Sequence, residues 1–249
     1  MNGFFQQNVL LRNYIDTAKI NNFDFSGSTN TTIGFVVQNA NNTITTTNES
    51  LNFVGSPGAD VFEASIGAAT MLGGAGADNL KGSISNSTYI AGQSGIDTVE
   101  LIATNTSTDT VSYQDIKTAN NANNVTNFVA FLDDVNNAGR IRQDKLEFDA
   151  DTVTNFNAGV TVQQKTFAEL QDLLGTAAAD NTMLVDANPE NQDLSNHGKS
   201  WVALDNANGK LFYSQDGNFA VNAQQIGAIT FLNNDATEFL STQNVTVIA

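Results

Sequence analysis

The chain has 249 residues, with 26 acidic and 10 basic side chains, a formal net charge of −16 and no cysteine. The acidic balance argues against nucleic acid as a partner, because phosphate binding needs basic patches. The lack of cysteine excludes disulfides, zinc–thiolate sites and cysteine catalysis. The sequence has no apolar run of transmembrane length and no basic, apolar start, so we expect neither a transmembrane segment nor a cleavable N-terminal signal peptide.

The first part of the chain, residues 1–50, contains β-prone pieces at 32–37 and 43–47, separated by asparagine-rich spacers. We expect short strands here. This N-terminal β-rich segment is a candidate for assembly or ligand contact.

Three stretches, 55–62, 73–80 and 92–99, share one pattern: a glycine-rich turn, an aspartate, one further residue and an apolar residue. The aspartates, Asp60, Asp78 and Asp97, lie 18 and 19 residues apart. Glycines let the backbone bend so that its carbonyls point inward, and the aspartate adds a carboxylate, so the turn offers the hard oxygen ligands that suit calcium. The pattern is the nonapeptide G-G-x-G-x-D-x-U-x of the calcium-binding parallel β-roll.

The nonapeptide frame continues between these stretches in a degenerate form, with Ala69 and Ser87 where aspartate is expected. Two nonapeptides make one coil, so alternate turns fall on opposite edges of a roll. The three aspartates should therefore stack on a single edge, and the other edge should have lost its carboxylates. Asn42 and Asp115, each 18 residues beyond the ends of the aspartate series, could cap the stack.

The C-terminal part, residues 117–249, begins with an asparagine-rich spacer and then changes in character. It predicts strands at 128–132, 144–148, 227–232 and 245–248, a hairpin of 201–204 with 211–213, and one helix at 166–175 with a Thr166/Glu169 capping box. The expected fold is therefore mainly all-β. A short parallel β-roll at 51–116 is flanked by β-rich segments at 1–50 and 117–249, with the helix in the C-terminal part.

The repeats resemble the RTX family of calcium-binding proteins that bacteria export by type I secretion, and in particular its surface-layer and matrix types. The likeness is specific over 55–100. More loosely, 144–148, 166–175 and 209–217 resemble the segment that closes many such proteins, and the apolar tail at 244–249 resembles their uncleaved C-terminal secretion signal. The resemblance implies Ca²⁺ as cofactor, an extracellular or cell-surface location, and contact of the tail with the type I secretion apparatus.

The resemblance also implies a ligand set, with each ion held between two turns one coil apart. The first ion would use the carbonyls of Ser56, Gly58, Gly73 and Ala75 with the carboxylates of Asp60 and Asp78. The second would use the carbonyls of Gly74, Gly76, Gly92 and Ser94 with Asp78 and Asp97. Asp78 would bridge the two ions, and the short array implies two or three ions in all.

Catalytic patterns are missing from the sequence. A single histidine, His197, cannot build a zinc site, and there is no H-E-x-x-H, G-x-S-x-G or glycine-rich phosphate loop. We expect His197 to be an exposed turn residue rather than part of a triad, and Trp201 to lie in the core.

The acidic pairs Asp133/Asp134 and Asp149/Asp151 could hold an ion or act as hydrolytic carboxylates, but solvated turn acids are the favoured interpretation. The oxygen-rich 205–209 fits a hairpin turn. We therefore expect a protein that is not an enzyme.

Three functions remain open. The favoured one is a secreted structural protein that folds and self-assembles outside the cell when calcium neutralises its aspartates, as in a surface layer or matrix fibre. The second is a calcium-dependent adhesin whose residues 1–50 bind a cell-surface glycan. The third is a hydrolase with an unrecognised carboxylate site, for which loss of turnover at Asp149 or Asp151 would be the sign.

Overall fold

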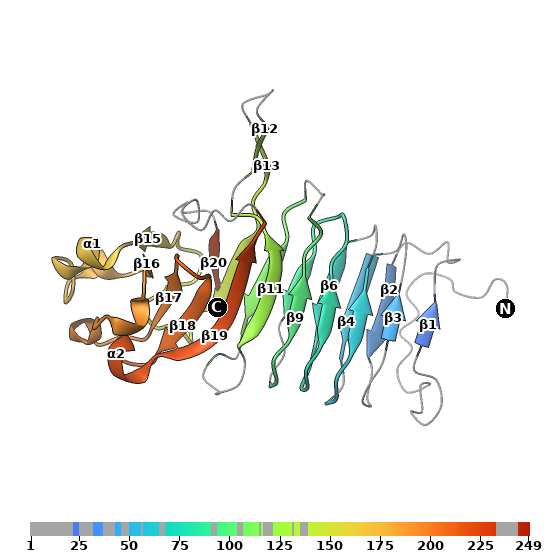
Figure 1. Ribbon diagram of the computed structural model, residues 1–249, viewed down its shortest axis with the longest axis horizontal. Helices are drawn as coiled ribbons and strands as arrows, with labels where there is room; N and C mark the ends of the chain where they lie inside the picture. The colour runs from blue at the N-terminus through green and yellow to red at the C-terminus, as the bar shows by residue number, and fades with distance from the viewer. Residues whose placement is uncertain are drawn as a thin grey trace.

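The structure is a computed structural model, and it describes residues 22–24, 32–36, 43–45, 50–55, 57–64, 68–90, 94–103, 107–114, 116, 122–130, 132–134, 139–232 and 244–249. Within these ranges the protein is mainly β, with largely parallel strands and two short α-helices (Figure 1). No helix among them is long and apolar enough to cross a membrane. The expected all-β fold with parallel strands is confirmed.

Two sheets contain almost all the described strands. Sheet 1 has the spatial order β1 (Asn22–Asp24), β3 (Thr43–Thr45), β5 (Val61–Glu63), β7 (Asn79–Lys81), β9 (Thr98–Glu100), β11 (Asn123–Phe128), β19 (Gln224–Phe231), β18 (Lys210–Ser214), β17 (Trp201–Asp205), β16 (Thr182–Asp186) and β15 (Gln163–Lys165). Sheet 2 has the order β2 (Thr32–Val36), β4 (Ser50–Val54), β6 (Ala69–Leu72), β8 (Thr88–Ile90), β10 (Thr110–Tyr113), β14 (Lys145–Asp149) and β20 (Val245–Ile248). β12 (Leu132–Asp134) and β13 (Gly139–Arg142) form a separate antiparallel hairpin that projects from the roll (Figure 1).

From β1 to β11 the chain alternates between the two sheets, and each strand from β1 to β9 pairs in parallel with the strand two places further along the sequence. This is the winding of a parallel roll with two strands per coil. The roll is not limited to 51–116, because β2 pairs with β4 and both β11 and β14 continue its sheets. The predicted segment boundaries at 50/51 and 116/117 are therefore not breaks in the sheets.

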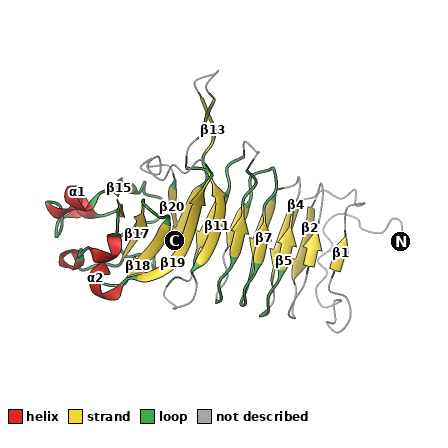
Figure 2. Ribbon diagram, viewed as in Figure 1, coloured by secondary structure: helices red, strands yellow, loops and turns green. Residues whose placement is uncertain are grey.

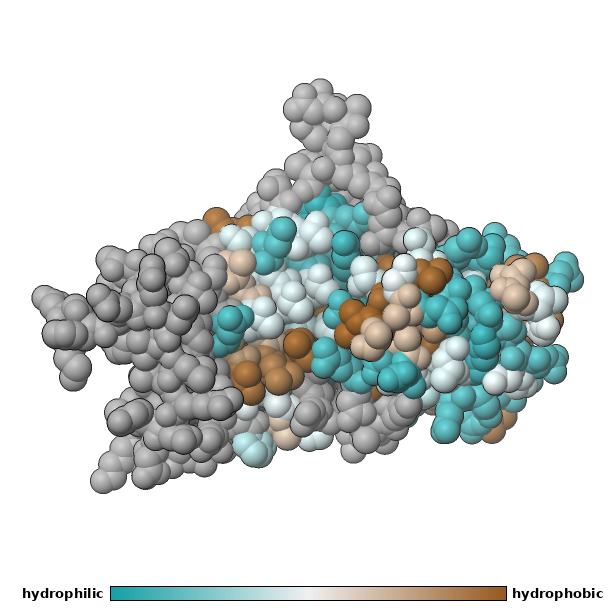
Figure 3. Space-filling view, turned by 180° about the vertical axis from the view of Figure 1, so that it is seen from behind, coloured by the Kyte–Doolittle hydropathy of each residue, from teal (hydrophilic) through white to brown (hydrophobic). Residues whose placement is uncertain are grey.

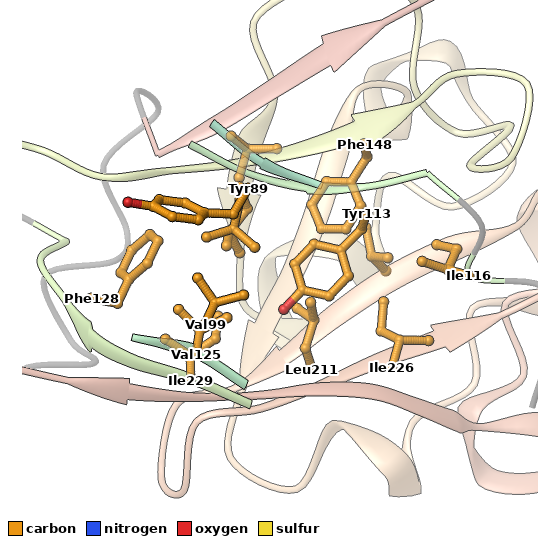
Figure 4. Close-up of a cluster of buried hydrophobic side chains, with 14 of the residues drawn as sticks. Tyr89, Val99, Tyr113, Ile116, Val125, Phe128, Phe148, Leu211, Ile226 and Ile229 are labelled. Atoms are coloured by element: carbon orange, nitrogen blue, oxygen red, sulfur yellow. The ribbon is translucent and has the colours of Figure 1, made fainter. Parts of the chain in front are cut away.

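The core lies between the two sheets and follows the repeat. The apolar residues two positions after the aspartates, Phe62, Leu80 and Val99, are fully buried, as predicted, and lie in register on sheet 1. Met71 and Tyr89 face them from sheet 2. Figure 4 shows how side chains from the two sheets meet farther along the roll. One continuous apolar column therefore runs through the coils.

The last part of sheet 1 has a second layer on its outer side. β17 and β18 form the predicted hairpin, with Val202 opposite Tyr213. A second apolar cluster around the fully buried Trp201 includes Leu170 and Phe219, which come from α1 (Phe167–Gln171) and α2 (Phe219–Asn222). Figure 2 shows the helices gathered at this end of the molecule. Here both faces of the sheet are covered, so its strands are apolar on both sides.

Two elements differ from their predicted extents. The Thr166/Glu169 capping box is present, but α1 ends at Gln171 instead of reaching Gly175, where the backbone adopts a positive φ of 81°. The strand predicted at 128–132 is instead divided: β11 ends at Phe128 and β12 begins at Leu132. The run is apolar because Phe128 and Val129 are buried in the roll, and this apolar character does not mark a single strand.

Candidate metal centre

The predicted aspartates stack on one side of the roll, at the N-terminal ends of the sheet 1 strands. We call the line of Asp60, Asp78, Asp97 and Asn123 the first edge. The Asp60 backbone N–H donates to Asp78 Oδ1 at 2.8 Å, and the Asp78 N–H donates to Asp97 Oδ1 at 2.9 Å. The Asp97 N–H donates to Asn123 Oδ1 at 2.9 Å. Each side chain therefore fixes the turn one coil before it, and all four are buried.

The opposite side of the roll carries a second ladder of the same kind, which we call the second edge: Ala69, Ser87, Asp109 and Asp144. The Ala69 N–H donates to Ser87 Oγ at 3.0 Å, the Ser87 N–H to Asp109 Oδ1 at 2.9 Å, and the Asp109 N–H to Asp144 Oδ1 at 3.0 Å. The expectation that this edge has lost its carboxylates was wrong. Asp109 and Asp144 occupy the aspartate position here, in later coils, and both are fully buried.

Glycine is required on the first edge because successive turns touch backbone to backbone. A Cβ added at Gly95 would lie 1.8 Å from the Gly76 carbonyl oxygen, and one at Gly55 would lie 1.7 Å from the Gly73 carbonyl oxygen. Gly95 also has a φ of 110°, which side chains rarely adopt. The glycines of the repeat therefore allow the turns to stack.

Asp78 is the residue of this stack whose carboxylate charge is least compensated. Its side chain is 2% exposed, and its Oδ2 atom has no hydrogen-bond partner among the described residues. Burial, reinforced by the negative charges of Asp97 and Asp60, raises the pKa of the Asp78 carboxyl from 3.8 to about 7, although the hydrogen bond from the Asp60 N–H opposes the shift. At neutral pH this position therefore favours either a proton or a cation.

The space beside the Asp78 oxygen is bounded by backbone rather than by side chains. A Cβ added at Gly73 would lie 2.5 Å from Asp78 Oδ2, so the bare glycine leaves that oxygen facing open backbone. A buried, unpartnered carboxylate oxygen in a glycine-lined turn fits a hard cation, which takes carboxylate and carbonyl oxygens.

The predicted ligands are only partly brought together. Asp60, Asp78 and Asp97 form the stack, and the Gly58 carbonyl lies against Gly76, where a Cβ would come within 2.7 Å of its oxygen. Ala75 forms a parallel bridge with Ser94.

The Ser94 carbonyl accepts the Gly76 N–H at 2.8 Å, so one of its lone pairs is engaged within the protein. Gly74 has the positive φ, 92°, of a tight turn. Ser56 and Gly92, and the proposed caps Asn42 and Asp115, lie outside the described residues. No group of three or more His, Cys, Asp or Glu side chains is arranged around a metal position in the described part of the chain.

The second edge contains its own cation. Arg142, at the end of β13, is fully buried, and its guanidinium pairs with both oxygens of Asp144, at 3.0 Å from Nε to Oδ1 and 2.6 Å from Nη2 to Oδ2. Nη2 also lies 3.8 Å from Asp109 Oδ2. The remaining donors reach the carbonyls of Ile102 and Asn127. Burial raises the pKa of the Asp144 carboxyl, and its hydrogen bonds and attraction to Arg142 oppose that shift.

His197 differs from its predicted surroundings. It lies on the short 3-10 helix Ser195–His197, but its side chain is only 5% exposed and packs edge-on against Trp201. Its Nε2 lies 2.7 Å from Asp180 Oδ1, an oxygen that Lys199 also contacts. The expectation of an exposed turn histidine was wrong because the loop folds back over the Trp201 cluster. No described residue forms a hydrogen bond with its Nδ1.

The other acidic candidates serve turns where they are described. Asp149 Oδ1 accepts the Asp151 N–H at 2.8 Å, and Asp205 Oδ1 accepts the Ala207 N–H at 2.8 Å within the hairpin turn. The side chains of Asp133 and Asp134 lie outside the described residues.

Sequence reasoning missed Asn123, Asp109, Asp144 and Arg142. The first three carry the signal seen in the repeats, a polar residue at the start of a short strand with a buried apolar residue two positions later. They lack the glycine turn, and their spacing to the preceding ladder member is 26, 22 and 35 residues instead of 18. Arg142 had no local signal.

Comparisons with known protein families, with curated proteins and with solved structures found no match.

Proposed function

We propose that this chain is a secreted structural protein of the RTX type, whose first edge binds Ca²⁺ and which then self-assembles outside the cell. The observation that carries this proposal is the buried, unpartnered Oδ2 of Asp78 within a stack of three carboxylates. A divalent ion between neighbouring turns would neutralise the stack and use that oxygen. Ca²⁺ is the natural choice because the available donors are carboxylate and backbone carbonyl oxygens.

The residues that would hold the ions are Asp60, Asp78 and Asp97, together with carbonyls of the glycine turns. Ca²⁺ would supply positive charge beside these three carboxylates. Without the ion, repulsion between buried carboxylates opposes stacking of the coils. With it, folding and ion binding become one process. Low intracellular calcium would then keep the acidic roll unfolded and exportable, and millimolar calcium outside would complete it.

Self-assembly is supported by the contrast between the outer faces of the two sheets. On sheet 2, Val54, Leu72 and Ile90 are aligned in one outward row. Over β4, β6, β8 and β10 the adjacent outward row consists of the polar, uncharged residues Asn52, Thr70, Thr88 and Thr110, and it continues into Lys145 of β14. This face is turned to the viewer in Figure 3, where pale and brown residues with some teal ones among them cover its middle, and teal residues predominate over the C-terminal part.

The equivalent row on sheet 1 carries Glu63, Lys81 and Glu100. In a chain with a net charge of −16, the uncharged part of this face, over β4, β6, β8 and β10, is the surface that two copies can bring together with the least repulsion. We therefore assign the copy-to-copy contact to this part of the outer face of sheet 2, before the charged residues of β14.

The calcium site is tested with Asp78→Asn, which removes the charge but keeps an oxygen that can accept the Asp60 N–H. Calcium titration calorimetry and thermal melts should show at least a tenfold weaker affinity and a loss of calcium stabilisation. Asp172→Asn, at the exposed C-cap of α1, is the matched charge control and should bind like the parent. Unchanged calcium binding by Asp78→Asn would refute the site.

Assembly is tested by sedimentation velocity in metal-free buffer and in millimolar calcium. Growth from a slow, expanded species into large particles supports the structural function, and Thr88→Glu should prevent it without weakening calcium binding. A shift only to a compact monomer would keep the calcium site and favour a binding module such as an adhesin. No shift would refute calcium-dependent folding.

A further inference from the structure

The surroundings of Arg142 have the composition of a cation site. Its guanidinium is enclosed by oxygens: both carboxylate oxygens of Asp144, Oδ2 of Asp109, and the carbonyls of Ile102 and Asn127. Two carboxylates and two backbone carbonyls are also the kind of donors that Ca²⁺ takes from proteins. A positive charge is thus held at the second edge by the same chemistry that the first edge offers.

The position of this charge is unusual for the chain. Of the lysine and arginine side chains that the structure describes, Arg142 alone is buried. A buried charge is tolerated when it is paired and its hydrogen-bonding groups are satisfied. The hairpin β12–β13 carries Arg142 at its base, next to the turn that leads into β14 and directly beside Asp144. The hairpin β12–β13, an insertion in the roll, therefore places the guanidinium of Arg142 beside the carboxylates of the second edge.

The two edges also differ in where their ladders end. The first edge ends on the neutral amide of Asn123, which adds no charge to the aspartates before it. The second edge begins with the neutral Ala69 and Ser87 and ends on two carboxylates that both face Arg142. Positive charge is supplied at the end of the second edge where the negative charge is concentrated.

We infer that Arg142 is the resident cation of the second edge, where it takes the place that a metal ion takes on the first edge, so that the roll responds to metal on one side only. The role of the Arg142 charge on the second edge is independent of the proposed function. The comparison of Arg142 with a metal ion rests on the proposed calcium site of the first edge.

The test compares Arg142→Met with Arg142→Lys in metal-free buffer. Methionine keeps an unbranched apolar stem and removes the charged guanidinium, leaving Asp109 and Asp144 without compensation. The melting temperature should fall by about 10 °C, as expected when one partner of a buried ion pair is removed. Lysine keeps the charge and loses the forked geometry, so it should lose less than half as much. Lys210→Met, at an exposed basic residue of β18, is the control and should change little.

Two further measurements sharpen the result. The double variant Arg142→Met/Asp144→Asn should melt above Arg142→Met, because it removes one of the two uncompensated carboxylates. Millimolar Ca²⁺ should raise the melting temperature of Arg142→Met by more than it raises that of the parent, since the emptied oxygen cage can accept the ion.

Equal losses in Arg142→Met and Arg142→Lys would show that packing rather than charge matters, and would overturn the inference. A double variant no more stable than the single one would do the same. If Ca²⁺ gave the Arg142→Met protein no extra stabilisation, the equivalence with a metal ion would be wrong. Failure of calcium binding at Asp78 would leave the metal-free comparison of methionine and lysine intact, so the two proposals can fail separately.

Discussion

The two edges of the roll use the same hydrogen-bond relay but balance its charge differently. On both edges a side-chain oxygen accepts the backbone N–H of the residue one coil earlier, at 2.8 to 3.0 Å. The first edge places three aspartates in succession and ends on the neutral Asn123. The second edge replaces the early carboxylates with Ala69 and Ser87 and compensates the late ones with Arg142.

This difference separates two roles of the aspartate in a coil. As a hydrogen-bond acceptor, it can be replaced by serine or asparagine, as Ser87 and Asn123 show. As a buried charge, it needs a partner, because an uncompensated carboxylate in the interior is costly. An edge that keeps several carboxylates without an internal cation is therefore the edge that would depend on a cation from solution.

The largest effect is expected from Gly95→Ala, which tests whether the turns of the first edge must touch. The added Cβ would lie 1.8 Å from the Gly76 carbonyl oxygen, at a φ of 110°. Because backbone has to move, we expect a loss of about 4 kcal/mol or more in the free energy of unfolding. Denaturant unfolding measures it.

The control for Gly95→Ala is Gly198→Ala, a glycine with a φ of 69° and nothing within 4 Å of the added Cβ. It carries only the cost of the left-handed conformation, about 1 kcal/mol. Similar losses for the two variants would mean that the stacked turns are not in contact.

The next largest effect is expected from a substitution that makes the second edge more like the first. Ser87→Asp adds a buried carboxylate one coil before Asp109, as Asp78 lies one coil before Asp97. We expect a loss of about 3 kcal/mol in metal-free buffer, partly recovered with calcium. Ser87→Asn keeps the acceptor for the Ala69 N–H without the charge and should stay close to the parent. If the two variants behaved alike, charge would not distinguish the edges.

The pH dependence of the metal-free protein tests the charge on the first edge. The pKa of Asp78 is about 7 in the folded protein and 3.8 without its surroundings, so the folded state holds this proton more tightly. The resulting stability is complete below pH 3.8 and is lost as the pH rises to about 7.

Between pH 5 and 7 the parent should therefore lose about 2 kcal/mol relative to Asp78→Asn. Chemical denaturation of dialysed, metal-free protein at several pH values provides the measurement. Parallel curves for the two proteins would contradict the raised pKa. Saturating Ca²⁺ should flatten the difference, because the ion holds the carboxylate in its charged form.

The smallest effect is expected on the outer face of sheet 1. Lys81 and Glu63 form an ion pair at 3.4 Å, with side chains 39% and 43% exposed. Such pairs contribute little in water, so Lys81→Ala should cost about 0.5 kcal/mol or less. A larger loss would show that surface charges, and not only the buried edges, set the stability of the roll.

The first edge could be predicted because its signal is local. Glycine turns, aspartates 18 and 19 residues apart and the apolar residue two positions later all fall within one short block, and the structure stacks them as expected. The helix cap at Thr166 and the hairpin of β17 with β18 depend on equally local signals, and both are present.

The sequence by itself determined the coil length, the inward column of Phe62, Leu80 and Val99, and the stacking of Asp60, Asp78 and Asp97, because each follows from a repeat of fixed period. Only the tertiary structure decided the second edge and the place of Asn123 on the first. Insertions between its coils stretch the spacing to 22 and 35 residues, and the cation arrives from a hairpin that belongs to no repeat. Hydrogen bonds and charge pairs depend on the distance between residues in space. The repeat period of the sequence predicts which residues lie close together only where every coil has the same length.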